Sequence, residues 1–135
     1  MRISSAKLTE GMNMSFVFVA LGGALGAVAR YAISLIPVKT PFPLLTLITN
    51  IIGAVLIGFI VGITDKKDNV SPNTVLFWKT GVCGGFTTFS TFSLETYMLF
   101  ENKSYALGGV YVVLSVCCCI MGILLGKKLS SVIAF

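Results

Sequence analysis

The sequence predicts an all-α membrane protein with four transmembrane helices. Hydrophobic residues make up 56% of the 135 residues and charged residues 11%, and the mean hydropathy is +0.94. A soluble domain typically carries roughly 25% charged residues, so this composition excludes a soluble monomer. A transmembrane helix needs about 20 mostly apolar residues. Four stretches meet that length and make residues 1–135 a single transmembrane domain: residues 14–36, 44–63, 75–100 and 105–126.

The connections between these spans are short, and their charges predict an orientation. Short connections favour antiparallel neighbours in one bundle. Cytoplasmic flanks of membrane proteins carry an excess of basic residues. Seven basic residues lie on or near the side that holds both termini and the second loop, and three lie on or near the other side. We therefore expect a multi-pass protein of the plasma membrane with both termini in the cytoplasm. The first group is Arg2, Lys7, Lys66, Lys67, Lys79, Lys127 and Lys128, and the second is Arg30, Lys39 and Lys103.

The residue types exclude several kinds of site. The chain has no histidine, which removes Ser-His-Asp and Cys-His catalysis and every His-ligated metal site. The net charge of +5 is spread among apolar blocks, and this pattern fits membrane flanks better than a nucleic-acid surface. Cys83 and the run at 117–119 contain no C-x-x-C pair. We interpret them as small packing residues, with thiol chemistry or metal binding as the alternative.

Small and polar residues recur at helical spacing in the first two spans. Gly22 and Gly26 form a GxxxG motif, which lets helix backbones approach closely in lipid. Asn50 lies within the second span, one turn after Thr46. A side-chain amide in lipid must find hydrogen-bond partners. Two interpretations of Asn50 stay open: a hydrogen bond between helices, or the wall of a polar pathway.

The third span has an unusual composition, G-V-C-G-G-F-T-T-F-S-T-F-S at residues 81–93. Gly84 and its neighbour, followed by β-branched Thr87 and Thr88, weaken a helix, so we expect a break at mid-membrane. The carbonyl groups freed by such a break coordinate ions or line water. The alternative is a packing segment whose hydroxyls bond to carbonyls one turn back. Further hydroxyls and two aromatic rings on one face follow: Phe89, Ser90, Thr91 and Phe92.

Two more polar patterns lie in the spans. A carboxylate in a span costs about 3 kcal/mol on insertion scales, so Glu95 needs a partner. Arg30 ends the first span on the same predicted side, and we predict a structural Arg30–Glu95 ion pair, with proton coupling by Glu95 as the alternative. In the fourth span Tyr111 and Ser115 are one turn apart, and Cys119 follows after another turn. They predict a narrow hydroxyl-rich strip on this helix.

These strings resemble the signature of the Fluc (CrcB) family of fluoride channels. The most specific string is G-V-C-G-G-F-T-T-F-S-T-F-S-L-E at residues 81–95. T-L-I-T-N-I-I-G at 46–53 and G-G-A-L-G-A-V-A-R-Y at 22–31 also match. The resemblance covers about residues 22–126, nearly the whole chain.

The resemblance implies an antiparallel dimer with two fluoride pores along its interface. It implies that backbone carbonyls of Gly84 and Thr87, from both subunits, hold a structural sodium ion that is not transported. Phe89 and Phe92 match the phenylalanines that line the pores. We assign to the pores in addition Thr46, Asn50, Thr88, Ser90, Tyr111 and Ser115, with Cys119 at a position where several relatives carry a hydroxyl.

The function that the resemblance implies is passive export of cytoplasmic fluoride, driven by the membrane potential, without an enzymatic step. The expected partners are the fluoride ion, membrane lipid and a second subunit, but no nucleic acid. The charge bias favours one fixed orientation, so the second subunit is either another copy or an oppositely oriented homologue. Competing classes are a proton-coupled multidrug exporter, for which Glu95 is the one intramembrane acid, and a non-transporting membrane subunit. An integral-membrane enzyme lacks the catalytic groups that it would need.

Overall fold

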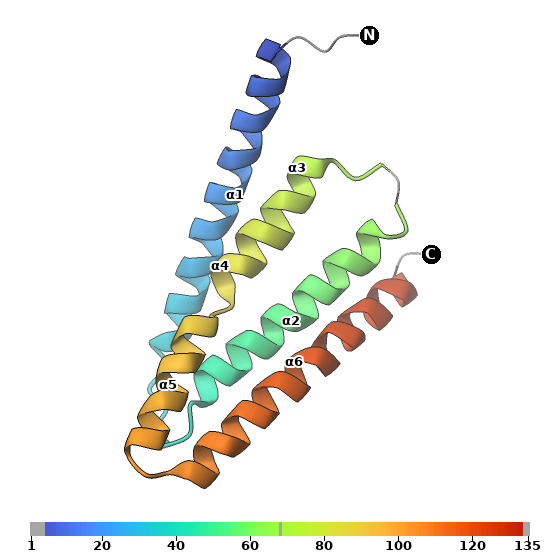
Figure 1. Cartoon of the computed structure of the whole chain (residues 1–135). Coiled ribbons are helices and arrows are strands. Elements are labelled where there is room, and N and C mark those ends of the chain that lie inside the picture. Colours follow the sequence, from blue (N-terminus) through green and yellow to red (C-terminus); the bar gives the residue numbers. More distant parts are fainter. Residues whose placement is uncertain (1–4, 68, 134–135) are drawn as a thin grey trace.

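The structure, a computed structural model, describes residues 5–67 and 69–133, and all regular structure in these ranges is helical. Arg2, which the orientation prediction counts, lies outside these ranges, and the Lys7 side chain lies outside the described side chains. Two long helices come first, shorter helices follow, and a long helix ends the described chain (Figure 1). In chain order they are α1 (Ser5–Ser34), α2 (Leu44–Thr64), α3 (Pro72–Val75), the π-helical η1 (Leu76–Cys83), α4 (Gly84–Phe86), α5 (Phe89–Glu101) and α6 (Tyr105–Ile133).

In the part of the chain that the structure describes, three helices are long and apolar enough to cross a membrane: Met12–Ser34 within α1, α2, and α6. Between 11% and 28% of the most apolar part of each is buried within the chain, so most of these apolar side chains face outward. Helices that are apolar on nearly every face are typical of membrane spans. The first, second and fourth predicted spans are thus confirmed as helices, although α6 continues to Ile133.

The segment predicted as the third span is divided by an interruption. α3, η1 and α4 run end to end, and α5 begins after Thr87 and Thr88 (Figure 1). Both threonines are extended, with φ/ψ of −79°/158° and −147°/113°. The predicted weak point comprised Gly84, Gly85, Thr87 and Thr88; the two glycines are helical, so the interruption lies at its threonine end. The β-branched threonines suit extended backbone better than helix.

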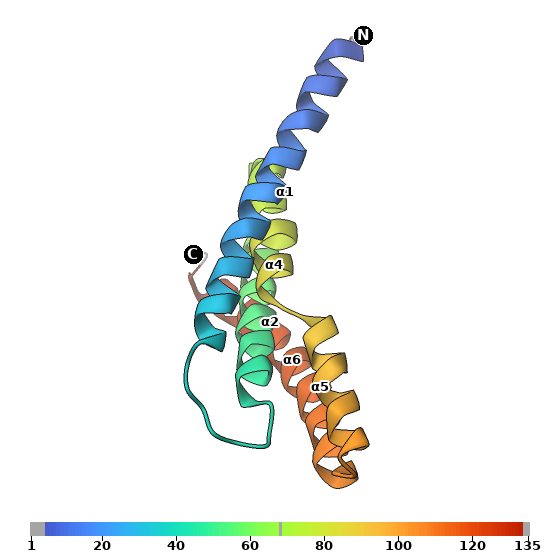
Figure 2. The same cartoon turned by 90° about the vertical axis from the view of Figure 1, so that its left-hand side faces the viewer.

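Two pairs of elements form the body of the chain. α2 runs along α6, and α1 runs along η1 and α4 (Figures 1 and 2). A Cβ on Gly26 would collide with the carbonyl oxygen of Val82, and a Cβ on Gly58 with the carbonyl of Ile123. Glycine at these two positions therefore lets the paired backbones touch. The packing interpretation of Gly26 is confirmed, and its contact lies within one chain.

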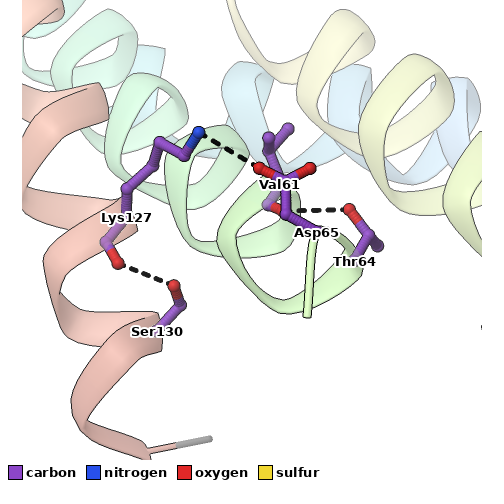
Figure 3. A network of polar contacts seen from close by, with 5 residues as sticks. All are labelled: Val61, Thr64, Asp65, Lys127 and Ser130. Carbon is purple, nitrogen blue, oxygen red and sulfur yellow. Dashed lines mark hydrogen bonds and ion pairs between the residues drawn. The ribbon is translucent and has the colours of Figure 1, made fainter. Parts of the chain in front are cut away.

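The C-terminal ends of α2 and α6 meet through polar contacts (Figure 3). Lys127 Nζ lies 3.1 Å from Asp65 Oδ2, and the two side chains are 47% and 58% exposed. An exposed pair of this kind contributes about 0–1 kcal/mol. Ser130, which is fully buried, donates its hydroxyl to the Lys127 carbonyl over 2.7 Å, and Thr64 donates to the Val61 carbonyl over 3.0 Å. Packing of α2 on α6, more than the ion pair, therefore holds this end together.

Candidate functional site

The interruption between α4 and α5 is held by a side chain from α2. Asn50 Oδ1 accepts a hydrogen bond from the Thr88 backbone N–H at 2.8 Å, and Asn50 Nδ2 donates to the Thr88 carbonyl at 3.2 Å. One amide thus replaces the two helical partners that Thr88 gives up by being extended. The structure therefore bears out the interpretation of Asn50 as a hydrogen-bonding link between helices.

The hydroxyls around the interruption have two roles. Thr88 Oγ1 accepts from the Thr91 backbone N–H at 3.2 Å and caps α5, as N-terminal threonines commonly do. Thr88 Oγ1 also donates to Thr91 Oγ1 at 2.9 Å and lies 3.3 Å from Ser90 Oγ. Thr87 Oγ1 instead donates to the Cys83 carbonyl at 2.9 Å. The bond to a carbonyl one turn back, which we weighed as the alternative for this segment, is therefore present at Thr87.

Two backbone carbonyl oxygens lie at the interruption without a hydrogen-bond donor from outside the helices, among the described residues. Apart from bonds within a helix, no hydrogen bond of the described residues is accepted by the carbonyl oxygen of Gly84 or Thr87. The neighbouring Gly85 carbonyl accepts from Arg30 Nε at 3.3 Å. Backbone carbonyl oxygens are ligands that hard cations prefer. The donor set at Gly84 and Thr87 therefore fits a cation such as sodium.

Glu95 and Arg30 are not partners, which corrects the predicted ion pair. Glu95 accepts one hydrogen bond on each oxygen, from Thr46 Oγ1 at 2.8 Å and from Tyr111 Oη at 2.7 Å. Hydrogen bonds to a carboxylate are roughly twice as strong as bonds between neutral groups. Two hydroxyls, from α2 and α6, thus satisfy the carboxylate, while Arg30 binds the backbone at the interruption. Among the described residues the one ion pair is Lys127–Asp65.

Aromatic rings surround the Tyr111 end of this network. The ring centroids of Phe92 and Tyr111 lie 5.2 Å apart, and those of Phe89 and Phe92 lie 5.5 Å apart. Phe42 meets the Tyr111 ring edge-on at 5.5 Å, a contact that the sequence patterns did not indicate. Tyr111 has no exposed surface, whereas Phe89 is 79% exposed. Phe89 therefore leaves most of its ring free for a partner outside this chain.

A cavity of about 540 Å³ collects most of the predicted site. Ser115 is among the lining residues, and its hydroxyl is buried without a hydrogen-bond partner among the described residues. Lys79 and Cys83 also line the cavity, and the sequence analysis did not place them there; their spacing of one helical turn was the available signal. Predicted site residues in the lining are Asn50, Gly84, Thr87, Thr88, Phe89, Phe92, Ser115 and Cys119.

Two of the remaining predicted residues, Arg30 and Thr46, line a second cavity. This cavity, of about 60 Å³, is lined by Thr88 and Thr91 as well, among others. Thr88 lines both cavities, so the extended segment separates the two. Ser90, Glu95 and Tyr111 line neither cavity. Hydrogen bonds connect Ser90 to Thr88 and Glu95 to Thr46, which do line a cavity, and Tyr111 is bonded to Glu95.

Comparison with known proteins assigns the family. A family model described as CrcB-like protein, Camphor Resistance (CrcB), matches residues 17–127. A protein of Ruminiclostridium cellulolyticum named Fluoride-specific ion channel FluC is 45% identical over 126 residues, which cover 90% of this chain and 95% of the relative. A Clostridium perfringens protein of the same name is 42% identical over 120 residues, covering 87% and 94%. A Flavobacterium psychrophilum protein of that name is 41% identical over 119 residues, covering 83% and 96%. The chain therefore belongs to the CrcB-like family of fluoride-specific ion channels, the family that its third-span signature resembles.

Proposed function

We propose that this chain forms a fluoride-specific channel that releases cytoplasmic fluoride passively across the plasma membrane. The observation that carries the proposal is the larger cavity, whose lining combines Ser115, with its unpartnered hydroxyl, and the rings of Phe89 and Phe92. Fluoride holds its water tightly, so a pore must replace that shell with donors. Hydroxyl and amide groups supply such donors, and aromatic rings offer positive edges to an anion. The names of the relatives support the same ion.

Passive export needs no coupled reaction. A membrane potential supplies about 2.3 kcal/mol per charge for each 100 mV, which is enough to drive an anion out of the negative cytoplasm. The expectation that the chain is not an enzyme agrees with its membership of a channel family.

The proposed channel is an antiparallel dimer with a structural sodium ion at its centre. The carbonyl oxygens of Gly84 and Thr87 would hold the ion, two from each subunit, because they lack other acceptor roles outside the helices. When bound, the positive charge offsets part of the cost of bringing an anion nearby. A two-fold axis would require both subunits to present the same interruption. The exposed Phe89 ring supports a partner on this face, and we place the interruption at mid-membrane.

The test is efflux from liposomes that contain the purified chain, read with fluoride and chloride electrodes. We expect rapid fluoride loss with no chloride loss. Replacing sodium by a large organic cation on both sides should slow or stop the loss, since Gly84 and Thr87 would lose their ligand. Fluoride and chloride loss at equal rates would contradict the selectivity, and unchanged loss without sodium would contradict the sodium site.

The proposal also concerns the identity and orientation of the second subunit. The basic residues of the sequence favour one orientation, with both termini in the cytoplasm, so we propose pairing with an oppositely oriented homologue. Cysteine-accessibility mapping of the two chain ends in cells should then find mainly one orientation. Equal populations of both orientations would contradict this pairing and favour a homodimer. If the chain alone is silent in liposomes, fluoride loss after co-reconstitution with such a homologue would support the heterodimer, and continued silence would contradict the channel itself.

A further inference from the structure

Among the described residues, Lys79 is the one charged residue in the lining of the larger cavity. The other lining residues are apolar, hydroxyl, thiol or amide residues, and no carboxylate is among them. We infer that Lys79 attracts fluoride into this cavity from the aqueous side next to α3, and so sets the rate of anion entry. The inference rests on the proposed function, because it concerns how the same cavity is filled.

Lys79 lies at one end of the cavity. Lys79 precedes Cys83 by one helical turn on η1, and Cys83 is 2% exposed. The lining continues along α2 from Asn50 to Ile57, which is about 10 Å at 1.5 Å per residue. α3 and the end of α2 lie on the same side of the interruption (Figure 1). Lys79 therefore lies toward the end of the cavity that is away from α5.

The charge of Lys79 is not neutralised within the described part of the chain. The single ion pair there is Lys127–Asp65, and no hydrogen bond from Lys79 Nζ occurs among the described residues. Lys79 is also exposed. A lysine in an apolar span is costly unless its charged head reaches water. A position on the cavity gives it such a route, and leaves a free positive charge where an anion would enter.

We expect Lys79 to attract anions into the cavity and not to select fluoride over other anions. An ammonium group is a strongly hydrated point charge on a flexible stem, so it attracts any small anion in its vicinity. Clefts lined by charge of one sign, with walls of low dielectric, raise the local concentration of the opposite charge and increase rates of entry. Selection would remain with the donors and rings deeper in the cavity, near Ser115 and Phe92. Loss of Lys79 should therefore lower the entry rate and leave the preference for fluoride over chloride unchanged.

The experiment compares Lys79→Gln with Lys66→Gln in the assembly that conducts fluoride. Lys66 follows α2 on the same predicted side and does not line the cavity, so its replacement is the matched control. Initial efflux is measured at low fluoride, at constant sodium and potassium, with an impermeant organic salt setting the ionic strength. Between about 0.01 M and 1 M salt the Debye length falls from about 30 Å to about 3 Å.

We expect Lys79→Gln to slow fluoride efflux by about fivefold at low salt, near the lower end of electrostatic effects on entry rates. The difference should nearly vanish at high salt, and Lys79→Arg should keep the wild-type rate. Equal rates for Lys79→Gln and Lys66→Gln at both ionic strengths would overturn the inference. So would a change of selectivity that salt does not affect.

Failure of the inference and failure of the proposed function can be told apart. A wild-type assembly that conducts no fluoride contradicts the proposed function before any variant is made. If Lys79→Gln does not assemble, the salt dependence of fluoride efflux through the wild-type assembly tests the inference. An efflux rate at low fluoride that falls as the organic salt is added supports attraction by the free charge, and a rate independent of salt overturns it.

Discussion

Replacing Phe89 and Phe92 together by isoleucine should abolish fluoride flux while the chain still assembles. Isoleucine keeps an apolar side chain but removes the positive ring edge that can face an anion. Aromatic edge contacts contribute about 0.5–1.5 kcal/mol each beyond their buried area. Two of them correspond to about 1–3 kcal/mol, and therefore to a loss of flux between about fivefold and somewhat over a hundredfold, since 1.4 kcal/mol is tenfold. The liposome efflux assay measures this directly.

The structure explains why this substitution should spare the fold. Phe89 is 79% exposed in the chain, so its ring adds little to packing within one subunit. Phe92 loses its ring contacts to Tyr111 at 5.2 Å and to Phe89 at 5.5 Å, and isoleucine fills part of that space. Phe16→Ile is the matched control, because Phe16 is 69% exposed on α1 and lines none of the cavities described above. Wild-type flux in the double variant would contradict the pore-lining role, and loss of flux in the control would contradict its specificity.

The sequence predicted the helices correctly where the pattern that indicates a helix lies within the segment itself. Uninterrupted apolar runs predicted α2 to within one residue, since hydropathy and length are properties of the segment itself. The end of α6 was predicted seven residues early because the helix continues past the apolar run, through Lys127 and Lys128 to Ile133. The interruption was expected in the segment of two glycines and two threonines, and it lies at Thr87 and Thr88. Asn50 of another helix holds it there, and a local pattern does not contain that partner.

The sequence predicted which residue types the site contains, but it did not predict which of these residues bond to one another. Glu95 was expected to pair with Arg30 because opposite charges on one side of the membrane attract. Folding instead brings Thr46 and Tyr111 to both carboxylate oxygens, and neutral hydroxyls satisfy the carboxylate. Composition identified each of these side chains as one that needs a partner in lipid. Which donors reach which acceptors depends on helix rotation and packing, which the spacing of residues along one helix does not specify.

Asn50→Ala should both destabilise the chain and abolish flux, because Asn50 holds the extended segment. The substitution leaves the N–H and the carbonyl of Thr88 without their partners. Each unsatisfied buried group costs about 1–3 kcal/mol, and lipid offers no water to replace the lost bonds. Asn50→Asp keeps the acceptor for the Thr88 N–H but loses the donor to the carbonyl, so we expect an intermediate loss. Thermal unfolding in detergent and liposome efflux measure the two effects.

The control for this prediction is Asn73→Ala. Asn73 also links two helices, since its Oδ1 accepts from Ser15 Oγ at 2.9 Å, but it lies on α3, away from the interruption. A stability loss of similar size with normal flux is expected there. Sodium dependence separates a role in positioning from a role in packing alone. If Asn50 positions the carbonyl of the neighbouring Thr87, the residual flux of Asn50→Asp should require more sodium than the wild type, whereas Asn73→Ala should not change the requirement. An unchanged sodium requirement in Asn50→Asp would leave Asn50 as a packing residue and contradict its link to the proposed ion site.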